Sequence, residues 1–242
     1  MRKIRIFAII LATLWSLNAT AGHHEENRQS VVGVAYSMNV NDPQAVVAAM
    51  TTYWTSPTGN KNKGYATLRQ VIAGGENPAT HIIAVAYPSY EAMDEAMALN
   101  ATSEDAAIFY QAMNKAATVT SRVAFDASGL TSGNIESVTN PLPVTAYFMM
   151  DVSNRRGFTE AFKNAPSNPE LATVASLFEV TADGDLDTDH GVAVRANDMA
   201  SLMSAMKANR SDPKWLEYIE SVSNMRSIRS RMITKDLAVF GR

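Results

Sequence analysis

A phrase of seventeen residues occurs twice in this chain, and it constrains the fold more than any other feature. The two copies are HIIAVAYPSYEAMDEAM, residues 81–97, and HGVAVRANDMASLMSAM, residues 190–206, and they are identical at five positions. Each copy has a histidine, a short apolar run typical of a strand, a polar break and a methionine-containing helical pattern. The offset of 109 residues predicts two related units, each of a common size for a compact domain.

The residues around the phrase also correspond in the two halves. Each half begins with a β-rich run that ends in helix N-cap candidates, and an amphipathic helix and two strands follow. A helical region and a last strand complete each half. The order β-α-β-β-α-β is that of a ferredoxin-like unit, whose sheet has one bare face that must be covered. We therefore predict an α+β fold in which two tandem ferredoxin-like repeats pack sheet to sheet. The predicted elements are strand 31–40, a helix from 43, strands 65–73 and 81–87, helical region 90–115 and strand 119–126, then strand 143–152, a helix around 158–162, strands 172–180 and 190–196, helical region 199–228 and strand 232–240.

The first residues have the pattern of a secretory signal peptide. A basic start precedes an apolar run over residues 6–17, and Ala19-Thr20-Ala21 supplies the small residues that signal peptidase accepts. We expect an exported protein, periplasmic or secreted. Turn-forming Gly, Pro, Asn and Ser residues near the middle of the chain indicate a linker. The predicted organisation is a signal peptide 1–21, a mobile tail 22–29, a first repeat 30–127, a linker 128–142 and a second repeat 143–242.

Composition excludes several classes of function. The predicted signal peptide holds three of the 21 basic residues, so 18 remain against 24 acidic residues, a net charge of −6. Such a chain, with no basic stripe, is not expected to bind nucleic acid. No second apolar run is long enough to span a membrane after cleavage. The chain has no cysteine, which excludes disulfides and thiol chemistry.

The element order, the repeat length and the repeated histidine-strand-helix phrase resemble the dimeric α/β-barrel superfamily. The segment Asp212-Pro213-Lys214-Trp215 is similar to a phrase common before the last helix in that superfamily, whereas the first repeat has Asp105-Ala106-Ala107-Ile108 there. The resemblance implies a single-chain barrel, a tandem-repeat exported member in which the second repeat replaces the partner of a dimer. The superfamily includes cofactor-free monooxygenases, stress-responsive proteins and haem-binding members, so it implies a fold rather than one activity.

Two groups of residues are candidates for a ligand site. His81 and His190 occupy equivalent places and either face a ligand or fix the start of a strand by a hydrogen bond. Because side chains alternate along a strand, the two histidines share a sheet face with apolar residues, and that face is equally able to pack against the helices. The other group consists of polar residues whose parity on the strands is opposite to that of an apolar, helix-facing set, so we expect them between the sheets. Asn39 and Asp151 also lie just before helices and are equally good candidates for capping. This second group is Ser37, Asn39, Tyr147 and Asp151, and Arg69 on the second strand is a further candidate for it.

The new N-terminus is a candidate metal site. Cleavage after Ala21 places His24 third in the mature chain, and the amine, two amides and imidazole form a square-planar set that suits Cu(II) or Ni(II). The alternative is that His24 is part of a polar tail without a ligand. Trp54, Trp215 and the methionines are better explained by core packing than by a pocket.

The leading functional hypothesis is a soluble exported protein that binds a small, mostly apolar ligand between its two sheets. An oxygenase or isomerase in the same cavity, needing no cofactor, is an alternative, with a histidine or tyrosine as the proton-transfer group. A structural or assembly module without a ligand is a third. No cofactor is expected, and haem held by an axial histidine is the weaker option. The chain is expected to be a monomer or a homodimer.

Overall fold

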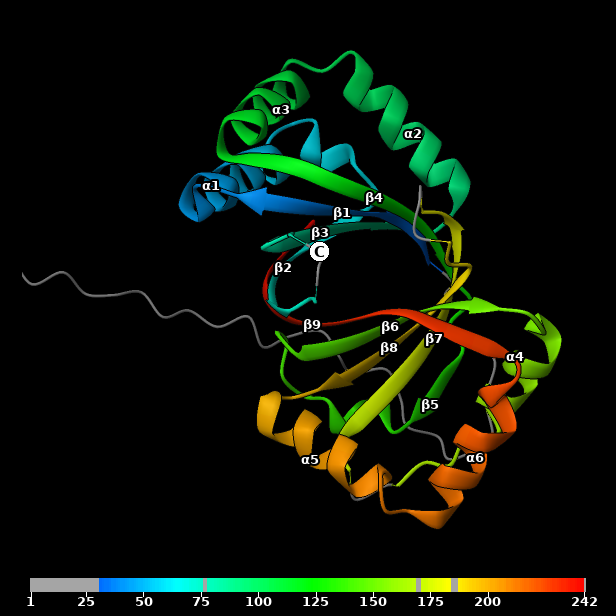
Figure 1. Ribbon diagram of the computed structural model, residues 1–242. Coiled ribbons are helices and arrows are strands. Elements are labelled where there is room, and N and C mark those ends of the chain that lie inside the picture. Colours follow the sequence, from blue (N-terminus) through cyan, green and yellow to red (C-terminus); the bar gives the residue numbers. More distant parts are fainter. Residues whose placement is uncertain (1–30, 76–77, 169–170, 184–186, 242) are drawn as a thin grey trace, which may run out of the picture.

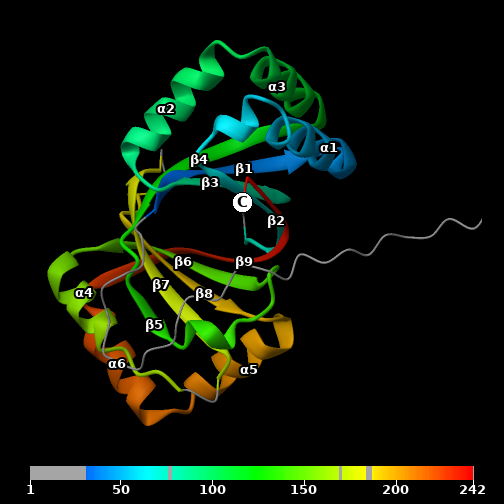
Figure 2. The ribbon, with the colours of Figure 1, turned by 180° about the vertical axis from the view of Figure 1, so that it is seen from behind.

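The chain forms two ferredoxin-like repeats that share one closed sheet. The computed structural model describes residues 31–75, 78–168, 171–183 and 187–241. The predicted signal peptide, the predicted tail and His24 lie outside the described residues. Helices α1 to α3 cover one side of the barrel and α4 to α6 the other, with the strands between them (Figures 1 and 2). The predicted α+β fold of two tandem repeats is confirmed.

The first repeat has the predicted order, and its helical region is divided in two. Asp42 caps the first helix by accepting a hydrogen bond from the Ala45 amide at 3.0 Å, and Pro43 occupies the first turn, where its missing N–H is harmless. Ser103 caps α3 in the same way. The elements are β1 (Val31–Val40), α1 (Pro43–Trp54), the 3-10 turn η1 (Gly59–Lys61), β2 (Tyr65–Ala73), β3 (His81–Tyr87), α2 (Tyr90–Ala101), α3 (Glu104–Ala116) and β4 (Ala117–Ala127).

The second repeat follows the same order with different lengths. Asn154 caps its first helix, and Asp212 caps its last, with Pro213 in the first turn. The segment predicted as a linker contains a short strand and a 3-10 turn. The elements are β5 (Thr131–Gly133), η2 (Ile135–Ser137), β6 (Val144–Val152), α4 (Arg155–Lys163), β7 (Thr173–Ala182), β8 (His190–Ala196), α5 (Met199–Asn209), α6 (Pro213–Ser223) and β9 (Arg226–Phe240).

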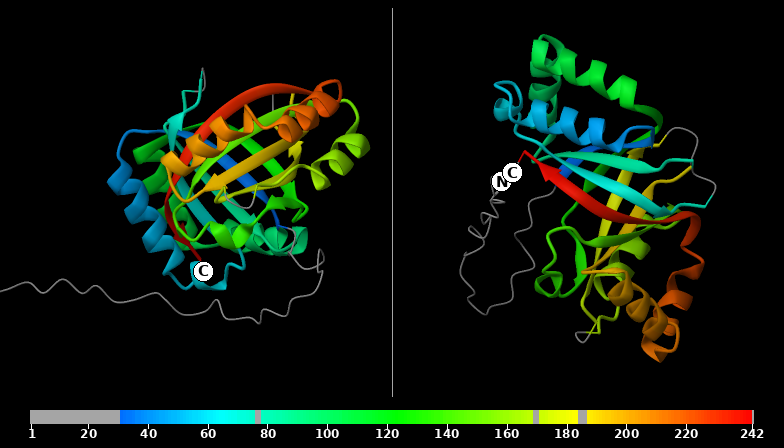
Figure 3. Two further views of the ribbon diagram at one scale, coloured as in Figure 1. Left: turned by 90° about the horizontal axis from the view of Figure 1, so that it is seen from below. Right: turned by 90° about the vertical axis from the view of Figure 1, so that its left-hand side faces the viewer.

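The two sheets are joined along both edges. The strand order β4-β1-β3-β2 in the first repeat continues into β9-β6-β8-β7 in the second, and β7 pairs with β4 to close an eight-stranded barrel. The β2–β9 pairing is visible in the right panel of Figure 3, where the red strand runs beside the cyan one. Strand β5 adds to β7 outside the ring. Every edge that a lone ferredoxin-like unit exposes is therefore paired with the other repeat.

The main cores lie between the sheets and their helices. In the first repeat Met38, Leu68 and Ile83 pack on residues of α1 and α3 such as Met50. In the second repeat Phe158 belongs to the equivalent cluster. Because strand side chains alternate, the residues between these positions face the inside of the barrel. No helix among the described residues is long and apolar enough to cross a membrane.

Candidate functional site

The paired histidines lie on the helix side of the sheet. His81 and His190 begin β3 and β8, and each is opposite a methionine of the first strand of its repeat, Met38 and Met150. His81 is 8% exposed and His190 1%. The ring of His190 lies edge-on to Phe158 of α4, with 6.3 Å between the centroids. The barrel interior, where the other candidate group was expected, therefore contains neither histidine.

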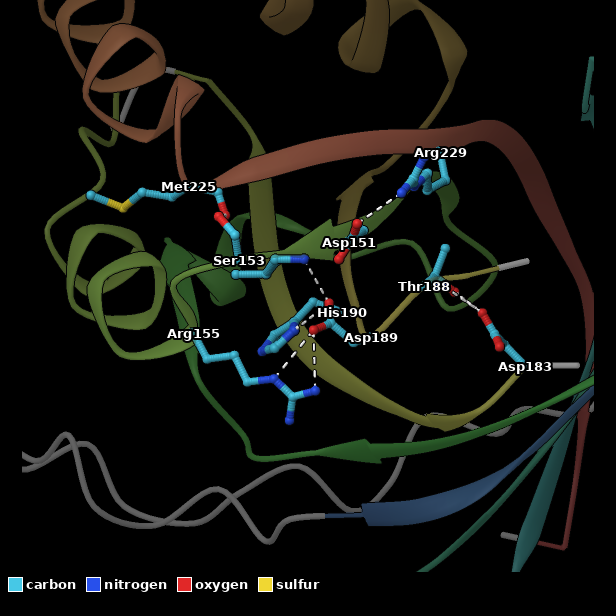
Figure 4. A network of polar contacts seen from close by, with 10 residues as sticks. Asp151, Ser153, Arg155, Asp183, Thr188, Asp189, His190, Met225 and Arg229 are labelled. Carbon is cyan, nitrogen blue, oxygen red and sulfur yellow. Dashed lines mark hydrogen bonds and ion pairs between the residues drawn. The ribbon is translucent and has the colours of Figure 1, made fainter. Parts of the chain in front are cut away.

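Each histidine belongs to the same local hydrogen-bond arrangement. Nδ1 of His81 lies 3.0 Å from Oγ1 of Thr80, which accepts a hydrogen bond from the Val40 amide at 2.9 Å. In the second repeat, Nδ1 of His190 lies 3.0 Å from Oδ1 of Asp189, which accepts from the Val152 amide at 2.8 Å (Figure 4). These contacts tie the start of the third strand to the end of the first strand in both repeats. They favour the structural interpretation of the two histidines.

Asp189 is also paired with a cation. Arg155 of α4 donates from Nε to Oδ2 of Asp189 at 3.2 Å (Figure 4). Burial raises the pKa of Asp189, but hydrogen bonds from His190 and the Val152 amide, with the charges of His190 and Arg155, outweigh it and lower the pKa below its ordinary value. The carboxylate thus remains ionised and joins α4, β6 and β8.

Two residues of the second candidate group meet inside the barrel. The guanidinium of Arg69 on β2 lies 5.7 Å from the ring centroid of Tyr147 on β6, and its Nε donates to Oδ1 of Asp236 on β9 at 3.0 Å. Tyr147 also contacts Phe178, with 6.4 Å between the centroids. Ser37, on the equivalent face of β1, is buried. These interior side chains contact one another across strands that belong to different repeats.

Asn39 and Asp151 lie near the strand ends and do not cap the helices. The caps are Asp42 and Asn154, each three residues further along, so the capping alternative was wrong for both residues. Asp151 instead pairs with Arg229 of β9 at 2.8 Å (Figure 4). The structure thus places the candidates in separate regions: Arg69 and Tyr147 together, and Asp151 with a different arginine.

A pocket of about 360 Å³ lies on the helix side of the second repeat, between its sheet and helices α4, α5 and α6. It is not between the two sheets, where we expected the ligand. Strands β6, β7, β8 and β9 form one wall, and the segment after α4 closes one side. The apolar part of the lining includes Phe148, Phe158, Phe162, Met206, Trp215 and Tyr218.

The pocket exists because the first helix of the second repeat is short. Helix α1 has 12 residues and buries Tyr53 and Trp54 in its last turn. Helix α4 has 9 residues and ends at Lys163. Counted from the two caps, Ala165 and Pro166 stand where the first repeat has Tyr53 and Trp54, and both line the pocket. Two large aromatic side chains are thus replaced by two small ones, and proline cannot continue a helix.

The first repeat has a smaller version of the same space, about 220 Å³, lined by Tyr36, Tyr110 and Asn100 among others. Its extension towards α1 is closed because the Tyr53 hydroxyl donates to Oδ1 of Asn100 at 2.6 Å. The equivalent of Asn100 is Asn209, which lines the larger pocket. Both repeats therefore have a space at equivalent positions, and only in the second repeat does it extend towards the first helix of the repeat.

The sequence contains the signal that would have located this pocket. Alignment of the two N-cap residues, Asp42 and Asn154, places the Tyr53-Trp54 dipeptide against Ala165-Pro166. A large-to-small exchange at a core position predicts a cavity in one copy. Trp215, which we assigned to core packing, is part of the lining.

The described lining of the pocket is poor in residues that hold a metal ion or haem. The described residues hold no group of three His, Cys, Asp or Glu side chains arranged to bind a metal ion. No histidine is among the described lining residues, so the pocket lacks the axial imidazole that the haem option requires. The described lining offers phenol, amide and guanidinium groups instead.

The closed eight-stranded sheet with helices outside is that of a dimeric α/β barrel in a single chain. Solved structures share this fold: an anthrone oxidase-like protein superposes with a TM-score of 0.58 at 10% identity, covering 88% of this chain and 93% of that chain. A candidate monooxygenase from Fusobacterium nucleatum gives a TM-score of 0.56 at 15% identity over 87% and 94% of the two chains. Chlorite dismutase from Candidatus Nitrospira defluvii, in complex with imidazole, gives 0.51 at 8% identity over 86% and 91%. No protein-family model matches the sequence, and no curated protein does. The resemblance in fold is therefore confirmed.

Proposed function

We propose that this protein binds a small, mostly apolar molecule in the pocket of its second repeat. The observation that supports this most directly is the exchange of Tyr53 and Trp54 for Ala165 and Pro166. A cavity of this kind lowers stability in proportion to its volume, so a chain that retains one gains from a ligand that fills it. The volume of about 360 Å³ falls within the range of small-molecule sites, and most of its wall is formed by apolar side chains, several of them aromatic.

The test is to transfer the aromatic pair of the first repeat into the second. The double variant Ala165→Tyr/Pro166→Trp should weaken binding of a neutral apolar probe, N-phenyl-1-naphthylamine, by about tenfold or more because the pocket is filled. Circular dichroism should show that the variant remains folded. Unchanged probe binding in this variant would contradict the proposal.

Trp215 provides a second readout. Trp54→Phe leaves Trp215 as the only tryptophan in residues 22–242. Binding in the pocket should then change the fluorescence emission of this single tryptophan.

Mass spectrometry of the molecule that co-purifies with the unaltered protein would identify the natural ligand directly.

An oxygenase that needs no cofactor is the second candidate for the same pocket. It is favoured by the fold likeness to a candidate monooxygenase and to an anthrone oxidase-like protein, and by the Tyr218 phenol at the pocket wall. Burial raises the pKa of Tyr218, and Arg226 partly opposes this, so its hydroxyl would donate a hydrogen bond to a substrate oxygen rather than act as a base. Oxygen uptake with an anthrone, lost in Tyr218→Phe, would support this candidate. Absence of uptake by the unaltered protein would eliminate it for that substrate.

We propose separately that the protein is exported and that His24 at its new N-terminus is a candidate ligand for Cu(II). Cell fractionation and native mass spectrometry would show whether residues 1–21 are removed. If Gly22 is then the first residue, titration with Cu(II) should give a visible absorption band that His24→Ala removes. Cleavage elsewhere would end the copper hypothesis without affecting the pocket.

A further inference from the structure

The pocket of the second repeat has a positively charged side. Its described lining includes Arg210, Arg226 and Arg231 and no Asp or Glu. This is unusual for a chain with a net charge of −3. Within the described residues, none of the three guanidinium groups forms an ion pair or a side-chain hydrogen bond. The positive charge at the pocket is therefore not neutralised by the described protein.

Arg226 is the most constrained of the three. It is the first residue of β9 and is half-buried. Burial lowers the pKa of Arg226, the nearby phenol of Tyr218 opposes this, and the positive charge of Arg231 lowers it further. A partly desolvated cation beside a second cation is unfavourable unless an anion approaches both.

Of the two arginines Arg226 and Arg231, only Arg231 has a counterpart in the first repeat. Arg231 lies over the ring of Phe148, with its guanidinium carbon 6.0 Å from the centroid. In the first repeat Arg122 lies over Tyr36 at 5.8 Å, at the same place in the strand register. One arginine over a ring is thus common to both repeats.

Arg226 has no counterpart in the first repeat. It pairs with Val152 in the register, and the equivalent pair in the first repeat is Ala117 with Val40. The second arginine thus occurs only in the repeat that has the wider pocket. Asn209 and Tyr218 add polar groups to the same lining, and neither side chain has a hydrogen bond to another described residue.

We infer that the ligand is an aromatic or other apolar acid whose anionic group is bound by Arg226 and Arg231 while its apolar body packs on the aromatic walls. This inference rests on the proposed function and names the chemical class of its ligand. Guanidinium groups bind carboxylates and sulfonates by charge-assisted hydrogen bonds. Arg226 is half-buried and Arg231 is exposed, so the anionic group would lie at the mouth of the pocket with the apolar body inside. A neutral apolar molecule of the same shape would leave both arginines without a partner.

A matched pair of probes tests the charge separately from the pocket. 1-Anilinonaphthalene-8-sulfonate is anionic, and N-phenyl-1-naphthylamine has the same rings without the sulfonate. The unaltered protein should bind the anionic probe more tightly than the neutral one. Arg226→Gln and Arg231→Gln should each weaken binding of the anionic probe by about ten- to a hundredfold, the range expected for a lost hydrogen bond to a charged group. The affinity for the neutral probe should change by less than about twofold in either variant, because this probe has no anionic group for the arginines to bind.

Two arginines serve as controls. Arg229, on the same strand, pairs with Asp151 and is not part of the pocket lining. Arg122 is the counterpart of Arg231 in the first repeat. Arg229→Gln and Arg122→Gln should leave the affinity for both probes unchanged.

The outcomes distinguish the two hypotheses. If the neutral probe binds in the pocket, as shown by its loss in Ala165→Tyr/Pro166→Trp, and the two arginine variants do not discriminate between the probes, the acid inference is overturned and the pocket remains. If neither probe binds the unaltered protein, the proposed function fails as well. Equal weakening of both probes by the control variants would also overturn the inference, because it would show that loss of any arginine has the same effect.

Discussion

The His81 side chain is held in its neutral form at the start of β3. Burial lowers its pKa from the ordinary value, and its Nδ1 contacts Thr80. In the unfolded chain the same imidazole takes up a proton at its ordinary pKa of about 6.5. The folded state therefore binds this proton less readily than the unfolded state does.

This difference makes stability depend on pH. The contribution of His81 to the free energy of unfolding is fully present above the unfolded pKa and is lost as the pH falls towards the lower folded pKa. Urea unfolding at several pH values below 7 should show a decline that is shallower in His81→Gln, which does not titrate. The comparison is between slopes, so any constant destabilisation by the variant does not affect it. Parallel slopes would show that His81 contributes nothing to the acid sensitivity.

At the scale of the elements, the segment Asp212-Pro213-Lys214-Trp215 both caps α6 and contributes one residue to the pocket wall. Asp212 Oδ1 accepts hydrogen bonds from the amides of Lys214 at 2.8 Å and Trp215 at 3.4 Å. Pro213 fits the first turn, and Trp215, the third residue of the helix, lines the pocket. The phrase that suggested the superfamily thus fixes the start of a helix and, through it, the place of an aromatic side chain.

Loss of this cap should affect stability and binding together. Asp212→Ala should lower the free energy of unfolding by about 1 kcal/mol, as is usual for a lost N-cap, and weaken probe binding because Trp215 is less well held. Asp198 caps α5 through the Ser201 amide at 2.7 Å and is not part of the described lining. Asp198→Ala should cost a similar amount without altering binding. A binding defect of equal size in both variants would show that general destabilisation is the cause.

The order of the elements was predictable because it depends on local patterns: N-cap residues, apolar periodicity and turns. The residues at which the elements begin and end were less predictable. The second helical region was expected to reach Ile228, but α6 ends at Ser223 and β9 begins at Arg226. The alternation of Arg226 and Ile228 with exposed residues fits a strand as well as a helix end, and pairing with β6 decides between them. The bulges of β9 depend on its partner strands and leave no local signal.

The site was harder to predict than the fold. Strand parity placed Tyr147 between the sheets, Arg69 of the second strand was a further candidate for the same group, and the structure brings the two together. Parity does not reveal how much space remains between a sheet and its helices. That space depends on where α4 stops and on the small side chains at Ala165 and Pro166. A pocket that results from missing volume appears only when one repeat is compared with the other.

At the scale of the whole molecule, the two repeats depend on each other through both barrel seams. The seams are the β2–β9 and β4–β7 pairings, and Arg69 and Asp236 form a largely buried ion pair across the first of them. The sheet face that each repeat turns inward is covered only by the other repeat. Strands β7 and β9 take part in both the pocket and the seams, but through different residues. Thr173 and Ala175 of β7 and Arg226, Ile228 and Arg231 of β9 line the pocket, whereas the seams pair residues 179–182 and 233–240. The helix side can therefore diverge, as in α4, without disturbing the seams.

A single repeat should therefore not fold as a monomer. In a fragment of residues 22–129, β2 and β4 lose their partners and Arg69 loses Asp236, which leaves two open edges, an uncovered sheet face and an arginine without its ion-pair partner. Exposed faces and edges of this kind favour association. Light scattering with urea unfolding should show either an unfolded chain or a dimer whose stability rises with concentration. A dimer would support the view that the second repeat replaces a partner subunit. A monomeric fragment that unfolds cooperatively, at a midpoint independent of concentration, would show that each repeat has a sufficient core of its own.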